Sequence, residues 1–194
     1  MYGPLTLGGA VRRRIFDILT SSIGLIMAVV LAVAGGLLLW GHNYIHNEVS
    51  SQLAAQKIFF PPADSPAIAA PEFAAMHQYA GQQLTTGPQA QVYADHFIAN
   101  HLEKIGGGKT YAELSTQLQT DPTNTELAKT VQTMFQGETL RGLLLSSYAF
   151  WTIGTIAGWA ALAAFISAGI LLILSIIGLI HSRRVAATEE LLPE

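Results

Sequence analysis

The sequence predicts an all-α membrane protein: a hairpin of two transmembrane helices with a small, mainly helical extracytoplasmic domain inserted between them. Two long uncharged runs support this prediction, one from about Ile18 to Gly41 and one from Leu143 to Ile180. As a continuous helix the second run would be about 57 Å long, whereas a bilayer core needs only about 20 helical residues, or about 30 Å. The second run is therefore longer than a membrane span alone requires.

The second run changes character along its length. Its first third carries hydroxyl and aromatic side chains, and from Ile156 onward it is almost purely Ala, Leu, Ile and Gly. We therefore expect a helix over residues 143–181 whose membrane span covers about 156–180. Trp151 and Trp159 would then lie near the outer interface, where indole side chains are favoured.

The first run follows Arg12–Arg14, so a signal peptide is the alternative to a retained span. A signal peptide has an apolar region of about 7–15 residues. The run over 18–41 is longer and has no clear small-residue cleavage site at its end, so we expect a retained span.

Arginines precede the first run and follow the second, at Arg183 and Arg184. The positive-inside rule then places both termini in the cytoplasm of a plasma-membrane protein. The predicted parts are a cytoplasmic tail over 1–17, a span over 18–41, an extracytoplasmic helical domain over 42–142, the helix over 143–181 and a cytoplasmic tail over 182–194.

The composition agrees with this class. Of 194 residues 51% are hydrophobic and only 12% are charged, which is too apolar for an ordinary soluble domain. Without cysteine there is no disulfide, thiol catalysis or lipoprotein anchor. The net charge of −3 and the dispersed basic residues do not indicate nucleic acid as a partner.

Both runs carry small residues at four-residue spacing. In lipid, where no hydrophobic force drives helices together, such residues let backbones approach closely. We expect these positions to pack the two spans on each other or to dock a partner subunit, and both interpretations stay open. They are Ala28, Ala32 and Gly36 in the first run, and Gly154, Gly158, Ala160, Ala164 and Ala168 in the second.

The inserted domain reads as short helices. We expect the first helix to continue over 42–57, an extended loop over 63–71 and a short helix over 72–80. A helix over 88–105 should follow, since proline suits the first turn of a helix. Its apolar face comprises Tyr93, Phe97, Ile98, His101, Leu102 and Ile105.

Two capping boxes predict the remaining helix starts. The segment Thr110-Tyr-Ala-Glu113 follows the glycines Gly106, Gly107 and Gly108, so we interpret this stretch as a structural turn and cap. The segment Thr123-Asn-Thr-Glu126 repeats the signal, and the helix that it starts should run through Gly137 into the second span.

No predicted site carries chemistry. His42 and His46 have the four-residue spacing of a metal pair, but an interfacial polar face has that spacing too. The segment Gly106–Thr110 resembles the end of a phosphate-binding loop, yet position 103, where the first glycine of that motif belongs, is glutamate. We therefore expect no enzyme, no metal and no cofactor.

Several blocks together resemble a family of small two-span membrane proteins from actinobacteria, often labelled "aromatic ring-opening dioxygenase". They are Val49–Leu53 with Lys57-Ile58, Gly107–Leu114 and Leu140-Arg141. The resemblance covers about 49–164, and the sequence departs from it over 59–71. The label does not fit, because a non-haem iron site needs two histidines and a carboxylate in a spacing that this sequence lacks.

The small-residue faces, the uncharged spans and the absence of a catalytic set lead to the functional expectation. We expect a non-enzymatic accessory subunit that docks on a larger integral membrane protein complex in the lipid bilayer. The most concrete candidate is an actinobacterial respiratory supercomplex of cytochrome bc1 and cytochrome c oxidase. The alternative is an extracytoplasmic binding module for a lipid, a peptide or a cell-wall component.

Overall fold

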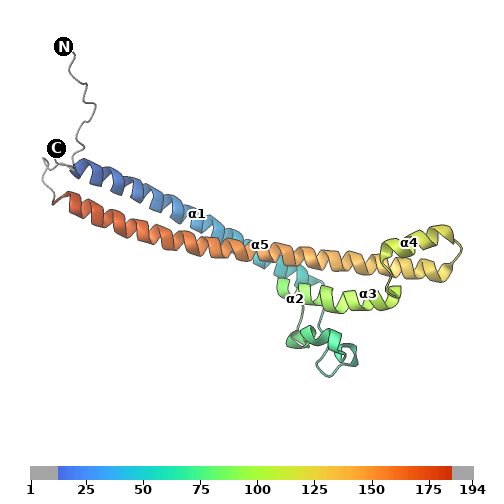
Figure 1. Cartoon of the computed structure of the whole chain (residues 1–194). Helices are drawn as coiled ribbons and strands as arrows, with labels where there is room; N and C mark the ends of the chain where they lie inside the picture. Colours follow the sequence, from blue (N-terminus) through green and yellow to red (C-terminus); the bar gives the residue numbers. More distant parts are fainter. Residues whose placement is uncertain (1–12, 185–194) are drawn as a thin grey trace, which may run out of the picture. The chain divides into compact units, whose positions relative to one another are not determined.

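The computed structural model describes residues 13–184, so most of both predicted tails lies outside the described residues. Helices α1 (Arg13–Ala55) and α5 (Thr125–Ser182) are by far the longest elements, and residues 13–184 contain no assigned strand (Figure 1). The contacts group the described chain into a span unit, residues 13–40 with 157–184, and an insert unit, Gly41–Ile156.

The two long helices confirm the expected continuations. Helix α1 runs past the end of the apolar stretch to Ala55, and α5 passes through Gly137 without a break. Because each helix extends well beyond an apolar stretch, both belong partly to the span unit and partly to the insert unit.

The span unit buries small residues that repeat every seven positions. On α1 they are Ser21, Ala28 and Gly35, and on α5 they are Ala161, Ala168, Ser175 and Ser182. A seven-residue repeat is the signature of two helices that supercoil with a left hand, and small side chains let their backbones come close.

Two matching Ser-x-x-Gly segments meet in the span unit. A β-carbon at Gly24 would lie against Ser175 Oγ, and one at Gly178 would lie against Ser21 Oγ. Each serine hydroxyl therefore occupies the space that the glycine of the opposite helix leaves free, so α1 and α5 pack antiparallel in this unit.

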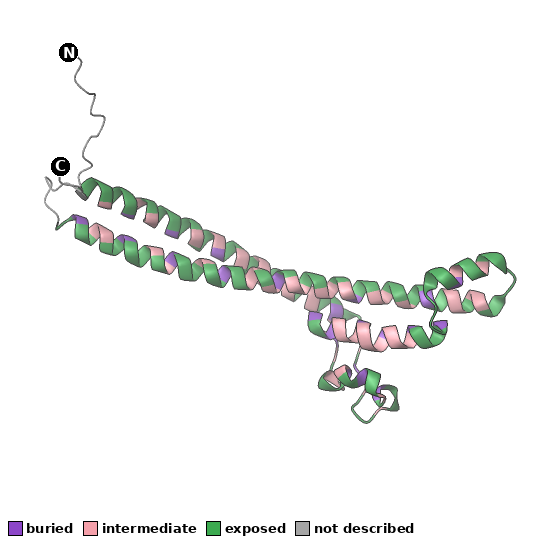
Figure 2. Ribbon diagram, in the orientation of Figure 1, coloured by how far each residue is buried: buried purple, intermediate pink, exposed green. Residues whose placement is uncertain are grey.

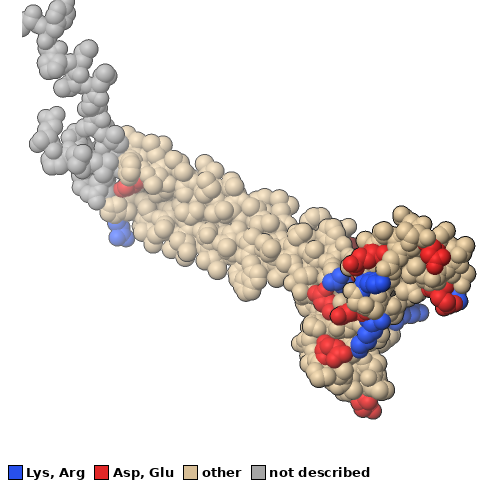
Figure 3. All heavy atoms as spheres, turned by 45° about the vertical axis from the view of Figure 1, so that its right-hand side comes forward, with Lys and Arg blue, Asp and Glu red and all other residues tan. Residues whose placement is uncertain are grey.

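Apart from charged residues at one end, Arg14, Asp17, Arg183 and Arg184, the rest of the span-unit surface is mainly apolar. Ile26 and Leu37, for example, are each 65% exposed, and only 11% of the most apolar stretch of either helix is buried (Figure 2). Most of the charged side chains gather on the insert unit (Figure 3). By length and composition, α1 and α5 are two helices able to cross a membrane.

The insert unit is built from short elements between α1 and α5. The expected loop over 63–71 contains a 3₁₀ turn, because Ser65 caps it and Pro66 begins it. The elements in order are η1 (Pro66–Ile68), η2 (Pro71–Tyr79), α2 (Gly87–Val92), η3 (Tyr93–Ile98), α3 (Ala99–Gly106) and α4 (Tyr111–Thr120).

The predicted helix over 88–105 is present, but its middle is a π-helix. Helices α2, η3 and α3 follow one another without a gap from Gly87 to Gly106. One other expectation needs a small correction, because the cap at the start of α5 is Asn124 rather than Thr123. Phe60 N–H also donates to Gln82 O, as part of an isolated antiparallel bridge between Phe59 and Gln83 that the sequence did not predict.

One compact apolar core fills the insert unit. Phe60 belongs to this core, and its ring packs edge-on against Tyr93 and obliquely against Tyr79. Burial raises the pKa of Tyr93, since the phenolate would be poorly solvated there. The other fully buried side chains of the core are Leu53, Ile68, Met76, Leu84, Met134 and Leu144.

Candidate functional site

Two histidines of α1 bind the backbone of α5 inside the insert unit. His42 Nδ1 donates to the carbonyl of Gly154 at 2.8 Å, and His46 Nε2 donates to the carbonyl of Trp151 at 3.1 Å. The His46 ring also stacks on the Trp151 indole, with centroids 3.9 Å apart. We call these four residues the histidine junction.

The junction needs a glycine in α5. A β-carbon at Gly154 would lie 2.7 Å from His46 Cδ2 and 3.1 Å from Ile45 Cγ2, which is closer than packed carbons come. Thr155 Oγ1 donates to the same Trp151 carbonyl at 3.0 Å. The His46 ring is thus held by stacking on Trp151, by its hydrogen bond to the Trp151 carbonyl and by close packing against Gly154, which has no side chain.

This geometry bears on whether His42 and His46, which have the spacing of a metal pair, could bind a metal ion together. A ring nitrogen that donates its proton to a carbonyl has no lone pair for a metal, so His42 Nδ1 and His46 Nε2 are engaged in helix packing. Within residues 13–184 no three side chains of the metal-ligating types come together. The arrangement positions two helices, and its chemistry is that of a structural contact.

Beside the junction lies an apolar groove of about 400 Å³, which we call the junction groove. Its only carboxylate is Glu48, whose Oε1 accepts a hydrogen bond of 2.6 Å from Gln52 Nε2. Phe150 and Ile153, contributed by α5, are more than half exposed. The lining residues are Tyr44, Ile45, Glu48, Val49, Gln52, Phe150 and Ile153.

The predicted turn and cap take the expected form. Gly107 and Gly108 have φ values of 63° and 78°, the left-handed region that favours glycine, and Gly106 ends α3. Thr110 caps α4 through a full capping box with Glu113. Hydrogen bonds from Thr110 lower the pKa of Glu113, and the bond from the backbone N–H has a larger effect than the bond from the hydroxyl.

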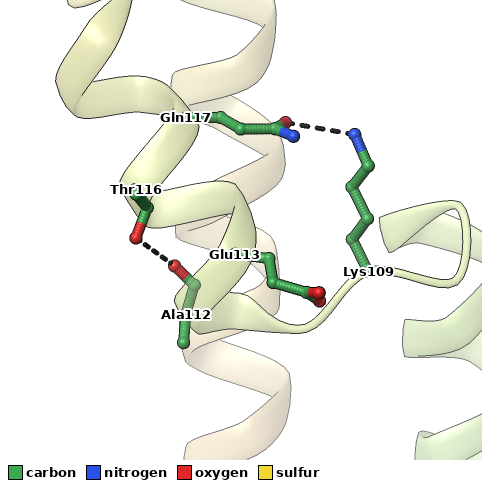
Figure 4. A pocket seen from close by; sticks show the side chains of 5 residues that line it. All are labelled: Lys109, Ala112, Glu113, Thr116 and Gln117. Carbon is green, nitrogen blue, oxygen red and sulfur yellow. Dashed lines mark hydrogen bonds between the residues drawn. The ribbon is translucent and has the colours of Figure 1, made fainter.

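Hydrogen bonds within the turn and cap also engage the backbone N–H groups that a phosphate would need. The N–H groups of Gly107, Gly108, Lys109 and Thr110 all donate within the turn and cap. Lys109 Nζ donates to Gln117 at 3.3 Å over a shallow hollow that the carboxylate of Glu113 also lines (Figure 4). A phosphate there would meet a negative charge and no free N–H cradle.

His101 also has a packing role. Its Nδ1 donates to the carbonyl of Phe97 at 2.7 Å, and its ring lies against Phe73 and Phe97. Nearby, Lys104 pairs with Glu72 at 3.1 Å while its ammonium lies over the Phe73 ring. These contacts tie η2 to α3 within the insert unit.

The small residues predicted for helix packing divide by exposure. In the span unit Ala28 and Ala168 are buried, Gly158 and Ala164 are partly buried, and Ala32, Gly36 and Ala160 are exposed; in the insert unit Gly154 is buried. The four-residue spacing is therefore not the spacing of the buried face, because the buried positions repeat every seven residues. Sequence reasoning missed Gly35, Ala161 and the two Ser-x-x-Gly segments.

Comparisons with protein-family models, with curated proteins and with solved structures find no match to this chain.

Proposed function

We propose that this protein is a two-span plasma-membrane subunit that docks on a larger integral membrane protein complex and performs no chemistry of its own. Both termini lie in the cytoplasm, and the insert unit lies on the extracytoplasmic side. This placement rests on the arginines before the first apolar run and after the second, and on two helices long and apolar enough to cross a bilayer. An actinobacterial respiratory supercomplex of cytochrome bc1 and cytochrome c oxidase is the most concrete partner.

The observation that carries the docking proposal is a second set of small residues that the helix pair leaves uncovered. Ala32, Gly36 and Ala160 are exposed in the span unit, and a β-carbon at Gly36 would meet nothing within 4 Å. In lipid, exposed small residues give another helix a place to approach closely. The hairpin uses one small face, and the exposed residues are available to a partner.

Native co-purification in mild detergent tests this proposal. Gly36→Leu and Ala160→Leu should each weaken retention of the accompanying chains, because a leucine would push a docked helix away. Val33→Leu is the matched control, since Val33 is already large and 59% exposed. All three variants should remain in the membrane fraction.

Two results would contradict the docking role. One is a wild-type protein that purifies alone and monomeric from its host. The other is unchanged co-purification of both Gly36→Leu and Ala160→Leu. Identification of the accompanying chains then decides whether they are respiratory subunits.

The alternative function is recognition of a lipid, peptide or cell-wall component by the insert unit. Buried apolar side chains form one cluster inside the insert unit, which favours a cap over a receptor domain. One observation favours binding, namely the junction groove, which is apolar and has a volume within the roughly 300–1,000 Å³ typical of small-molecule sites.

A further inference from the structure

We infer that the junction groove is a site for one phospholipid whose headgroup carries an ammonium group. The acyl end would lie against Ile45 and Ile153, and the ammonium would lie at Glu48. This inference rests on the membrane placement proposed above but not on docking to a partner complex.

The apolar part of the groove fits a hydrocarbon chain. Phe150 is 58% exposed and Ile153 is 54% exposed, although both line a hollow of about 400 Å³ beside Ile45 and Val49. An open trough between two helices suits a flexible chain, which gains contacts along its length and needs few directed hydrogen bonds.

The polar end of the groove fits a cation. Glu48 is its single carboxylate, and no Lys or Arg nitrogen within residues 13–184 lies within 4.0 Å of it. The hydrogen bond from Gln52 Nε2 holds the carboxylate beside the groove. An anionic headgroup, in contrast, would be repelled by the charge of Glu48.

The position of the groove along α1 suits a headgroup. Glu48 follows Gly41, the end of the apolar run, by about 10 Å at 1.5 Å per residue. The headgroup layer occupies roughly 5–8 Å on each side of the hydrocarbon core. Tyr44 and Ile45, about 5–6 Å past Gly41, lie within this layer, and Glu48 lies just beyond its outer edge. The ammonium of a bound lipid would therefore have to sit slightly outside the headgroup layer to reach Glu48.

The test is native mass spectrometry of the purified full chain in detergent with lipids added. The two probes are phosphatidylethanolamine and phosphatidylglycerol with identical acyl chains. The wild-type chain should retain one phosphatidylethanolamine about two- to fivefold better, the preference expected from one partly exposed ion pair.

Three variants locate the site. Glu48→Gln should abolish the preference, and Ile153→Trp should reduce retention of both lipids by filling the groove. Ile153→Ser removes apolar surface without adding volume and should act in the same direction. The matched controls are Glu103→Gln, an exposed carboxylate outside the groove, and Leu143→Trp, an exposed apolar residue elsewhere on α5. Both should behave as the wild type does.

Equal retention of the two lipids by the wild-type chain would overturn the inference, as would a preference that survives Glu48→Gln. Wild-type retention by both Ile153 variants would show that lipid binds elsewhere. Since this experiment contains no partner, its failure leaves the docking proposal untouched, whereas a chain that does not insert into membranes would refute both.

Discussion

The imidazole of His46 lies flat on the indole of Trp151, with centroids 3.9 Å apart and planes within 10° of each other. The two residues are 105 positions apart in the sequence, and His46 Nε2 also donates to the Trp151 carbonyl. The contact therefore fixes both the distance and the rotation of α5 relative to α1 within the insert unit.

The absence of a side chain at Gly154 should be essential to this contact. Gly154→Ala would crowd the His46 ring, which cannot turn away because Trp151 and its carbonyl hold it. Overpacking costs about 1–3 kcal/mol, against a helix gain of about 0.5–1 kcal/mol for replacing glycine by alanine. We expect a net loss of up to about 2.5 kcal/mol in the free energy of unfolding, measured in detergent.

Gly142→Ala is the matched control, because a β-carbon there would meet nothing within 4 Å in the same helix. It should stabilise the protein by about 0.5–1 kcal/mol. If the two alanine variants unfold alike, the junction does not depend on the close approach of the His46 ring.

The paired Ser-x-x-Gly segments predict a rescue. Gly24→Ala should destabilise the span unit because the new β-carbon would meet Ser175 Oγ. Adding Ser175→Ala removes that hydroxyl, and Ser175 Cβ at 3.7 Å is an ordinary contact, so the double variant should recover. Resistance to unfolding in sodium dodecyl sulfate measures the effect.

Gly169→Ala serves as the control for this rescue, since no atom lies within 4 Å of its added β-carbon. It should leave the resistance unchanged or raise it slightly. Independent, additive effects of Gly24→Ala and Ser175→Ala would contradict the pairing.

Local signals were enough to predict much of this fold. The uncharged runs predict both long helices, and the capping box at Thr110 predicts the start of α4 within the described range. Each depends on a few neighbouring residues. At the start of α5 two candidate caps stand side by side, and the backbone uses Asn124.

The packed face of the spans and the junction groove could not be predicted, because both depend on pairing between segments far apart in the sequence. Small residues occur in both spans at four-residue and seven-residue spacings, and only the partner helix selects the face that contains Ala28 rather than Ala32. The junction groove joins residues about a hundred positions apart, so no local pattern predicts it. The π-helical turn over Tyr93–Ile98 likewise has no signal that we identify.

The structural turn before α4 predicts that Thr110 contributes more to stability than its neighbour Lys109, whereas a phosphate-binding loop predicts that Lys109 matters more. Thr110→Ala should cost about 0.5–2 kcal/mol, the usual effect of a lost cap. Lys109→Ala should change the free energy of unfolding by no more than about 0.5 kcal/mol, because its ammonium makes one exposed hydrogen bond. Thermal unfolding with and without added nucleotide checks both, and nucleotide stabilisation that disappears in Lys109→Ala would reveal a phosphate site.

The lowered pKa of Glu113 predicts how the stability of α4 depends on pH. Hydrogen bonds from Thr110 N at 2.7 Å and Thr110 Oγ1 at 2.9 Å favour the carboxylate in the folded state. An unfolded glutamate has a pKa of about 4.3, so this stabilisation is present above that pH and is lost as the pH falls through the lower pKa of folded Glu113.

Amide exchange across Tyr111–Thr120, corrected for intrinsic rates, should therefore accelerate on acidification. Glu113→Gln should weaken protection at neutral pH and flatten this acid response, whereas Glu103→Gln should retain it. The same acid profile in Glu113→Gln and the wild type would show that the capping carboxylate does not govern α4.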